Sequence, residues 1–80
     1  MRIPRNISAV DLIKLLKHFG YTVTRQTGSH IRLSTEQNGQ HHITIPNHNP
    51  IKIGTCSAII ADVAIHFNKT KEEVMVTIFG

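Results

Sequence analysis

The segment Gly28-Ser29-His30 brings together a flexible backbone, a hydroxyl and an imidazole. Imidazole exchanges a proton near neutral pH, so His30 is suited to act as a general acid or base. Gly28 lets the backbone approach a phosphate closely, and Ser29 adds a hydroxyl and an amide. Arg32 supplies a positive charge for a phosphate in its transition state. The segment therefore fits phosphodiester chemistry, while Gly-Ser before a strand is also ordinary turn sequence.

A first helix is expected just upstream. Ser8 followed by Asp11 has the capping-box pattern, with the carboxylate in the place usually taken by Glu. The apolar residues that follow recur at helical spacing as far as Phe19, which predicts a helix from about Ser8 to His18. Gly20 then stands where a left-handed residue commonly closes a helix.

Three strands follow this helix in the predicted order. Residues 21–26 are rich in β-branched side chains, and Val23 and Arg25 alternate there with Thr22 and Thr24. Alternation continues in "HIRLST" and "HHITI" on either side of a loop that contains Asn38-Gly39. The predicted strands cover 21–26, 30–35 and 41–45.

The length of that loop decides which side chains share a face. A two-residue turn at 38–39 would oppose apolar to polar side chains, whereas a three-residue loop at 37–39 pairs Leu33 with Ile43. We prefer the second register because it gives the sheet one apolar face. The opposite, solvent-facing side then carries His30, Arg32, Ser34, His42 and Thr44.

A second helix is expected over 56–67, with Thr55 as its N-cap. Its outer surface is also largely apolar, which favours association with a partner. Thr70 and Glu73 repeat the capping-box pattern and favour a short third helix over 71–79, although the same run alternates as a strand would. The expected fold class is α+β, a three-stranded antiparallel sheet with helices on one face, in the order α-β-β-β-α plus a short C-terminal element.

Length and composition set further limits. Eighty residues, 40% hydrophobic and 18% charged, fit a single folded domain over 1–80. One cysteine, no secretory signal and no membrane-spanning apolar stretch lead us to expect a cytoplasmic protein without membrane insertion. Residues 1–35 hold six Lys or Arg and one Asp, a net charge of +5, and residues 36–80 hold three against four, a net charge of −1. This asymmetry favours a polyanionic partner, although scattered surface lysines explain the charge equally well.

Other reactive residues are weaker candidates. His41 and His42 are adjacent on a strand, so they point to opposite faces and do not readily share a metal ion. Cys56 lies near a helix start, where thiols can be activated, but a small core-facing residue is the simpler interpretation. We therefore expect neither metal nor cofactor, and we rank a thiol hydrolase below a nuclease.

The stretch "GYTVTRQTGSHIRL", followed by "ITIPNHNPIKIGT" and a helix, resembles the HicA-type, or YcfA-like, toxins of bacterial type II toxin–antitoxin pairs. The similarity spans about residues 8 to 75. It implies a fold related to double-stranded-RNA-binding domains and a messenger-RNA endoribonuclease, or mRNA interferase, that acts through one histidine. By position it assigns catalysis to His30, places Gly28 and Ser29 in the same motif, and puts Pro46 and His48 in a Pro-x-His segment.

The second helix departs from the family pattern, because Cys56 and the small residues after it stand where leucine and then basic residues are usual. The RNA contacts are therefore expected from the first half of the chain, with His48 as a secondary contact. The resemblance implies a HicB-type antitoxin that covers the sheet face or the apolar helix. It also allows a higher-order toxin–antitoxin complex. Two alternatives stay open: a non-catalytic RNA-binding module of the same fold, and a protein-interaction adaptor. The expected RNA or phosphate contacts are Gly28, Ser29, Arg32, Arg25, Lys14, Lys17 and His48.

Overall fold

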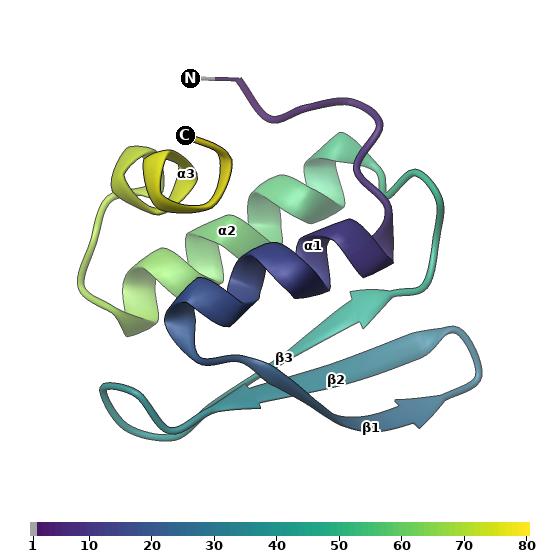
Figure 1. The fold of residues 1–80 in the computed structure, drawn as a ribbon, viewed down its shortest axis with the longest axis horizontal. Helices are drawn as coiled ribbons and strands as arrows, with labels where there is room; N and C mark the ends of the chain where they lie inside the picture. The colour runs from purple at the N-terminus through teal and green to yellow at the C-terminus, as the bar shows by residue number, and fades with distance from the viewer. Residues whose placement is uncertain (1) are drawn as a thin grey trace.

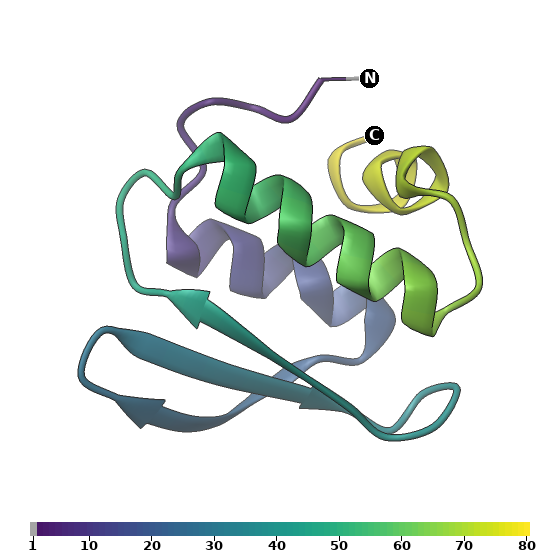
Figure 2. The ribbon, with the colours of Figure 1, turned by 180° about the vertical axis from the view of Figure 1, so that it is seen from behind.

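The computed structural model describes residues 2–80 as a sheet covered on one side by helices (Figure 1). The three strands are antiparallel in the order β1-β2-β3. Helices α1 and α2 cover one face of the sheet and leave the other open, while α3 and the N-terminal segment lie beyond the two helices (Figures 1 and 2). The predicted α+β architecture is confirmed. The elements are α1 (Ala9–Leu16), a 3-10 turn η1 (Lys17–Phe19), β1 (Thr22–Thr27), β2 (His30–Thr35), β3 (His41–Pro46), α2 (Ile53–His66) and α3 (Lys71–Phe79).

Helix α1 begins at the predicted capping box. The Ser8 hydroxyl accepts a hydrogen bond from the Asp11 backbone N–H (3.1 Å), and the Asp11 carboxylate accepts one from the Ser8 N–H (3.3 Å). The helix tightens into η1 and ends at Gly20, whose φ of 79° is the left-handed conformation expected of a closing glycine. A Cβ at Gly20 would lie 2.9 Å from the buried Thr35 hydroxyl oxygen, so close packing also requires glycine there.

The pairing of β2 with β3 follows the predicted register. Ile31 pairs with Ile45 and Leu33 with Ile43, and all four side chains are buried. The two chain positions at the tip of the loop, Asn38 and Gly39, have φ angles of 56° and 92°. The apolar face of the sheet therefore packs against the helices, and the face that carries His30 is open.

Strand β1 contains a bulge that the alternation in the sequence does not reveal. Val23 pairs with Leu33, but the next pair joins Arg25 to Arg32, so Thr24 is an extra residue on β1. An extra residue reverses the phase of the alternation, since directly paired residues share a face. Arg25 therefore lies on the open face with Arg32, and the predicted grouping of Arg25 with Val23 is wrong.

Helix α2 starts earlier than predicted. Its N-cap is Lys52, which makes no side-chain capping bond, and Thr55 lies within the first turn. The prediction of Thr55 as N-cap is therefore wrong. The Ile51 N–H donates to the Ile7 carbonyl (2.8 Å), which ties the chain down just before the helix. Helix α2 thus begins next to a tertiary contact and without a capping side chain.

Helix α3 forms as the capping-box pattern predicted, in place of the alternative strand. The Thr70 hydroxyl accepts from the Glu73 N–H (3.0 Å), and the Glu73 carboxylate accepts from the Thr70 N–H (2.8 Å). These hydrogen bonds to Thr70 lower the pKa of Glu73. Val74 and Ile78 are buried against the rest of the core. Among the described residues no helix is long and apolar enough to cross a membrane.

A polar network joins the buried side of the sheet to α2. The hydroxyl of the fully buried Tyr21 forms a hydrogen bond with Nδ1 of His41 (2.7 Å), and Nε2 of His41 lies 3.3 Å from the Asp62 carboxylate. His66 stacks on His41 with 4.4 Å between ring centroids. Burial, and secondarily the charge of Asp62, raise the pKa of Tyr21 to about 12. The His41 side chain thus lies on the helix-facing side of β3, opposite to His42.

Candidate nucleic-acid interface

The turn between β1 and β2 presents the Gly-Ser-His segment to solvent. Thr27 pairs with His30, so Gly28 and Ser29 are the two central residues of a tight turn. Only Gly28 of these two has a positive φ (56°), which is the sign pattern of a type II′ hairpin turn. A Cβ at Gly28 would meet nothing within 4 Å, so the backbone conformation alone favours glycine. The open space above this turn leaves its backbone accessible to a ligand.

His30 is exposed at the first position of β2. It pairs with Thr27 on one side and with Pro46 on the other, which places it on the open face as predicted. Arg32 is on the same face two residues further along, about 7 Å away by the rise of a strand. Within residues 2–80, the His30 ring has no hydrogen-bond partner, and so it remains available to a substrate.

Two arginines face each other across β1 and β2. Arg25 and Arg32 are directly paired and exposed, and neither guanidinium forms an ion pair with any described residue. Like charges placed directly opposite each other destabilise a sheet, and a bound anion relieves their repulsion. No acidic side chain shares this face in the described strands. The side chains on it are Thr22, Thr24, Arg25, Thr27, His30, Arg32, Ser34, His42 and Thr44.

His48 lies at the same end of the molecule as His30. The Asn47 N–H donates to the Ser29 carbonyl (2.6 Å), which joins the loop after β3 to the Gly-Ser turn. The His48 carbonyl in turn accepts from the Ala9 N–H (3.0 Å) at the start of α1. The imidazole of His48 is exposed. The structure thus gathers the Gly-Ser-His segment and the Pro-x-His segment at one edge.

A chain of hydrogen bonds crosses the other end of the open face. The Thr24 hydroxyl donates to the Arg32 carbonyl (3.4 Å) and lies 3.2 Å from the Ser34 hydroxyl, which contacts Nδ1 of His42. Because each hydroxyl has a single proton and Thr24 donates to Arg32, a continuous chain has Ser34 donate to Thr24 and accept from the Nδ1–H tautomer of His42. In that tautomer Nε2 is the ring nitrogen of His42 that is left as an acceptor. His30 is about 13 Å away, since four residues of β2 separate the two positions.

The sequence placed His42 on this face but gave it no role. Strand alternation alone identifies its side, whereas the hydrogen-bond chain depends on the bulge that brings Thr24 over Ser34. The bulge also explains why Arg25 joins the site although its predicted phase pointed it elsewhere. No feature of "YTVTRQ" marks the bulge, so the sequence offered no signal for either of them.

Two predicted RNA contacts lie elsewhere. Lys14 and Lys17 are exposed on α1 and η1, which belong to the helical layer (Figure 1). The structure does not bring them onto the open face with His30. An RNA bound across the sheet must pass around its edge to reach these two lysines.

Cys56 lacks the features of a reactive thiol. It is buried in the core, and burial raises its pKa, which is opposite to the shift that activates a nucleophilic cysteine. The interpretation of Cys56 as a small core-facing residue is confirmed. In the described part of the chain, no cluster of three or more His, Cys, Asp or Glu side chains could hold a metal ion.

Most of the chain matches a known protein family. Residues 9–65 match the family model described as the HicA toxin of bacterial toxin–antitoxin systems. The matched range runs from the start of α1 almost to the end of α2 and includes the whole sheet. No curated protein and no solved structure matches the chain.

Proposed function

This chain belongs to the HicA toxin family of bacterial toxin–antitoxin systems. We propose that its open sheet face binds messenger RNA and that His30 catalyses cleavage of the bound RNA. The observation that carries the proposal is the arrangement of His30, Arg25 and Arg32 on one exposed face without a carboxylate. Such a face attracts phosphates and holds an imidazole among them.

The chemistry begins at a ribose 2′-hydroxyl. His30, as general base, takes the hydroxyl proton while the 2′-oxygen attacks the adjacent phosphorus. The bond from phosphorus to the 5′-oxygen then breaks, and that oxygen must receive a proton. The protonated ring of His30 can return it, and the exposed His48 is a second imidazole at the same end of the sheet. No bound metal has a step in this scheme.

The positive charges have a separate task. A phosphodiester gains negative charge on its non-bridging oxygens as the 2′-oxygen attacks, and a guanidinium donates paired hydrogen bonds to such oxygens. Arg32 is about one strand repeat from His30 and is suited to this role, while Arg25 beside it binds a neighbouring phosphate. The turn at Gly28-Ser29, next to His30, offers accessible backbone groups to the phosphate that is cleaved.

The test is RNA turnover in excess chelator, which compares the wild-type protein with His30→Ala. His18→Ala is the matched control, because His18 is also exposed but lies on η1 in the helical layer. We expect wild type and His18→Ala to cleave single-stranded RNA and His30→Ala to lose cleavage. Undiminished cleavage by His30→Ala overturns the catalytic role. RNA binding without any cleavage by wild type supports the alternative, a non-catalytic RNA-binding module.

The partner and the compartment are also proposals. A toxin of this family has an antitoxin partner, and we assign to that role a HicB-type protein that covers the sheet face. The two paired arginines on that face would then be neutralised by acidic side chains of the antitoxin. Such a complex works in the cytoplasm, where messenger RNA is available.

A further inference from the structure

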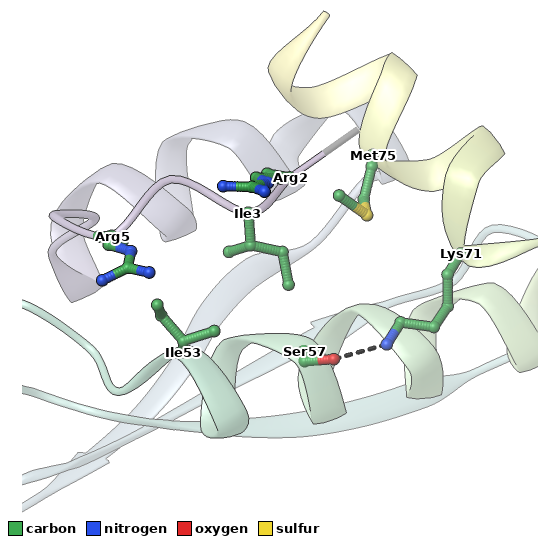
Figure 3. A pocket seen from close by; sticks show the side chains of 7 residues that line it. All are labelled: Arg2, Ile3, Arg5, Ile53, Ser57, Lys71 and Met75. Atoms are coloured by element: carbon green, nitrogen blue, oxygen red, sulfur yellow. Dashed lines mark hydrogen bonds between the residues drawn. The ribbon is translucent and has the colours of Figure 1, made fainter.

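A second candidate site lies on the opposite side of the molecule from the open sheet face. A pocket of about 480 Å³ is formed by the N-terminal segment, the start of α2 and one side of α3 (Figure 3). The N-terminal segment and α3 lie on the side of α1 and α2 that faces away from the sheet, whereas the open face lies on the other side of the sheet (Figures 1 and 2). A molecule bound in this pocket, which we call the N-terminal pocket, does not reach His30.

Three cations line the N-terminal pocket. Arg2 and Arg5 come from the N-terminal segment, and Lys71 approaches from α3 on the other side, where its ammonium donates to the Ser57 hydroxyl (Figure 3). No carboxylate is among the lining residues. Ile53, the first residue of α2, also lines the pocket, so the positive end of that helix dipole adds to the positive potential. These charges favour an anionic ligand in the pocket.

The floor of the N-terminal pocket is aliphatic. Ile3 and Ile53 point into the space between the N-terminal segment and α2, and Met75 closes it from α3 (Figure 3). Ile53 is 42% exposed, which is high for an isoleucine. A nucleic-acid backbone has no apolar group to cover this floor, and no aromatic ring is present to stack on a base. A peptide with aliphatic side chains between acidic ones matches both the floor and the rim.

We propose that the N-terminal pocket docks a short acidic, amphipathic segment of a partner protein. Aliphatic side chains of that segment cover Ile3 and Ile53, and its carboxylates reach Arg5 on one side and Lys71 on the other. The proposal does not depend on RNA cleavage at His30. It gives a toxin a place to hold a protein partner while its sheet face stays free for RNA.

The probe is a synthetic peptide with leucines at helical spacing flanked by glutamates, and its control has glutamine at every glutamate. Fluorescence anisotropy measures the binding of each labelled peptide to the full chain. We expect the glutamate peptide to bind at least about tenfold more tightly than the glutamine peptide, and added salt to weaken it. Absence of binding, or equal affinity for the two peptides, overturns the proposal.

Variants locate the binding. Arg5→Glu with Lys71→Glu reverses two charges of the pocket, and Lys69→Glu is the matched control because Lys69 is exposed outside it. An acidic residue is favourable in the first turn of α3, so the double variant should fold, and circular dichroism checks this. We expect the double variant to lose at least about tenfold in affinity and Lys69→Glu to change it less than about twofold. Unchanged affinity of the double variant contradicts the proposal.

A second pair of variants tests the aliphatic floor. Ile53→Asp places a charge at the first residue of α2, where the helix tolerates it, and Val76→Asp is the matched control on an exposed position of α3. Only Ile53→Asp should weaken binding of the peptide. RNA cleavage by both pocket variants should equal that of wild type, and His30→Ala should bind the peptide normally. If the pocket variants lose RNA binding instead, the pocket belongs to the RNA surface and the proposal fails.

Discussion

Tyr21→Phe removes one hydroxyl from the network that joins the sheet to α2. The hydroxyl is fully buried and forms a 2.7 Å hydrogen bond with Nδ1 of His41. Loss of one partner leaves a polar atom unsatisfied, which costs about 1–3 kcal/mol in a buried site. The His41 side chain is 19% exposed, so water can reach its ring and the lower figure applies. At neutral pH we expect Tyr21→Phe to lower the free energy of unfolding by about 1 kcal/mol.

The difference between the two proteins reverses at high pH. Burial raises the pKa of Tyr21 from 10.0 to about 12, so the unfolded chain releases the phenolic proton before the folded one does. Stability from this group is complete below pH 10 and falls as the pH rises towards 12. The loss in wild type is about 1.4 kcal/mol at pH 11 and about 2.3 kcal/mol at pH 12, and the phenylalanine variant has no such loss. The variant should therefore be the more stable protein above about pH 11.

Two measurements check this reversal. Urea unfolding of both proteins from pH 8 to pH 12 gives the difference in stability, and the comparison cancels the titration of groups that the two proteins share. Tyr21 is the sole tyrosine and the chain has no tryptophan, so the tyrosinate absorbance of wild type reports its ionisation directly. A phenolate midpoint near pH 10, or a stability difference that stays constant through pH 12, refutes the reasoning.

Two further predictions concern the open face and the turn that precedes β1. Replacing Arg25 and Arg32 together by Gln removes two phosphate contacts, so the slope of log affinity for single-stranded RNA against log salt should become shallower by about 1.4. An unchanged slope would exclude these arginines from the RNA contact. Gly20→Ala forces an L-residue into the left-handed region and towards Thr35, and should lower the free energy of unfolding by about 1–2 kcal/mol in urea titrations. Wild-type stability of this variant would show that the turn can relax.

Local rules predicted most of the fold. The two capping boxes placed the starts of α1 and α3 because the pattern is satisfied by neighbouring residues alone. The register of β2 with β3 followed from the requirement that one face be apolar. The start of α2 was missed because the contact of Ile51 with Ile7 joins segments far apart in the sequence. Local patterns carry no information about such contacts.

The candidate site shows the same division. His30 was placed correctly on the open face, since its position depends only on strand alternation and a short turn. The bulge at Thr24 was not predictable, because nothing in "YTVTRQ" distinguishes a bulged strand from a regular one. The pairing of Arg25 with Arg32 and the orientation of His42 both follow from that bulge. Tertiary structure therefore adds to the site the pairing of the two arginines and the hydrogen-bond chain to His42.

We propose that an imidazole on the open face, that of His30, removes the proton of a 2′-hydroxyl. The most direct measurement is the single-turnover cleavage of an RNA oligonucleotide in chelator, compared with the same oligonucleotide carrying one 2′-deoxynucleotide at the cleaved position. We predict that the deoxy substitution abolishes cleavage at that position and leaves binding nearly unchanged, and that the products of the ribose substrate end in a 2′,3′-cyclic phosphate and a 5′-hydroxyl. Cleavage of the deoxy substrate at the same position and rate would contradict this account of His30.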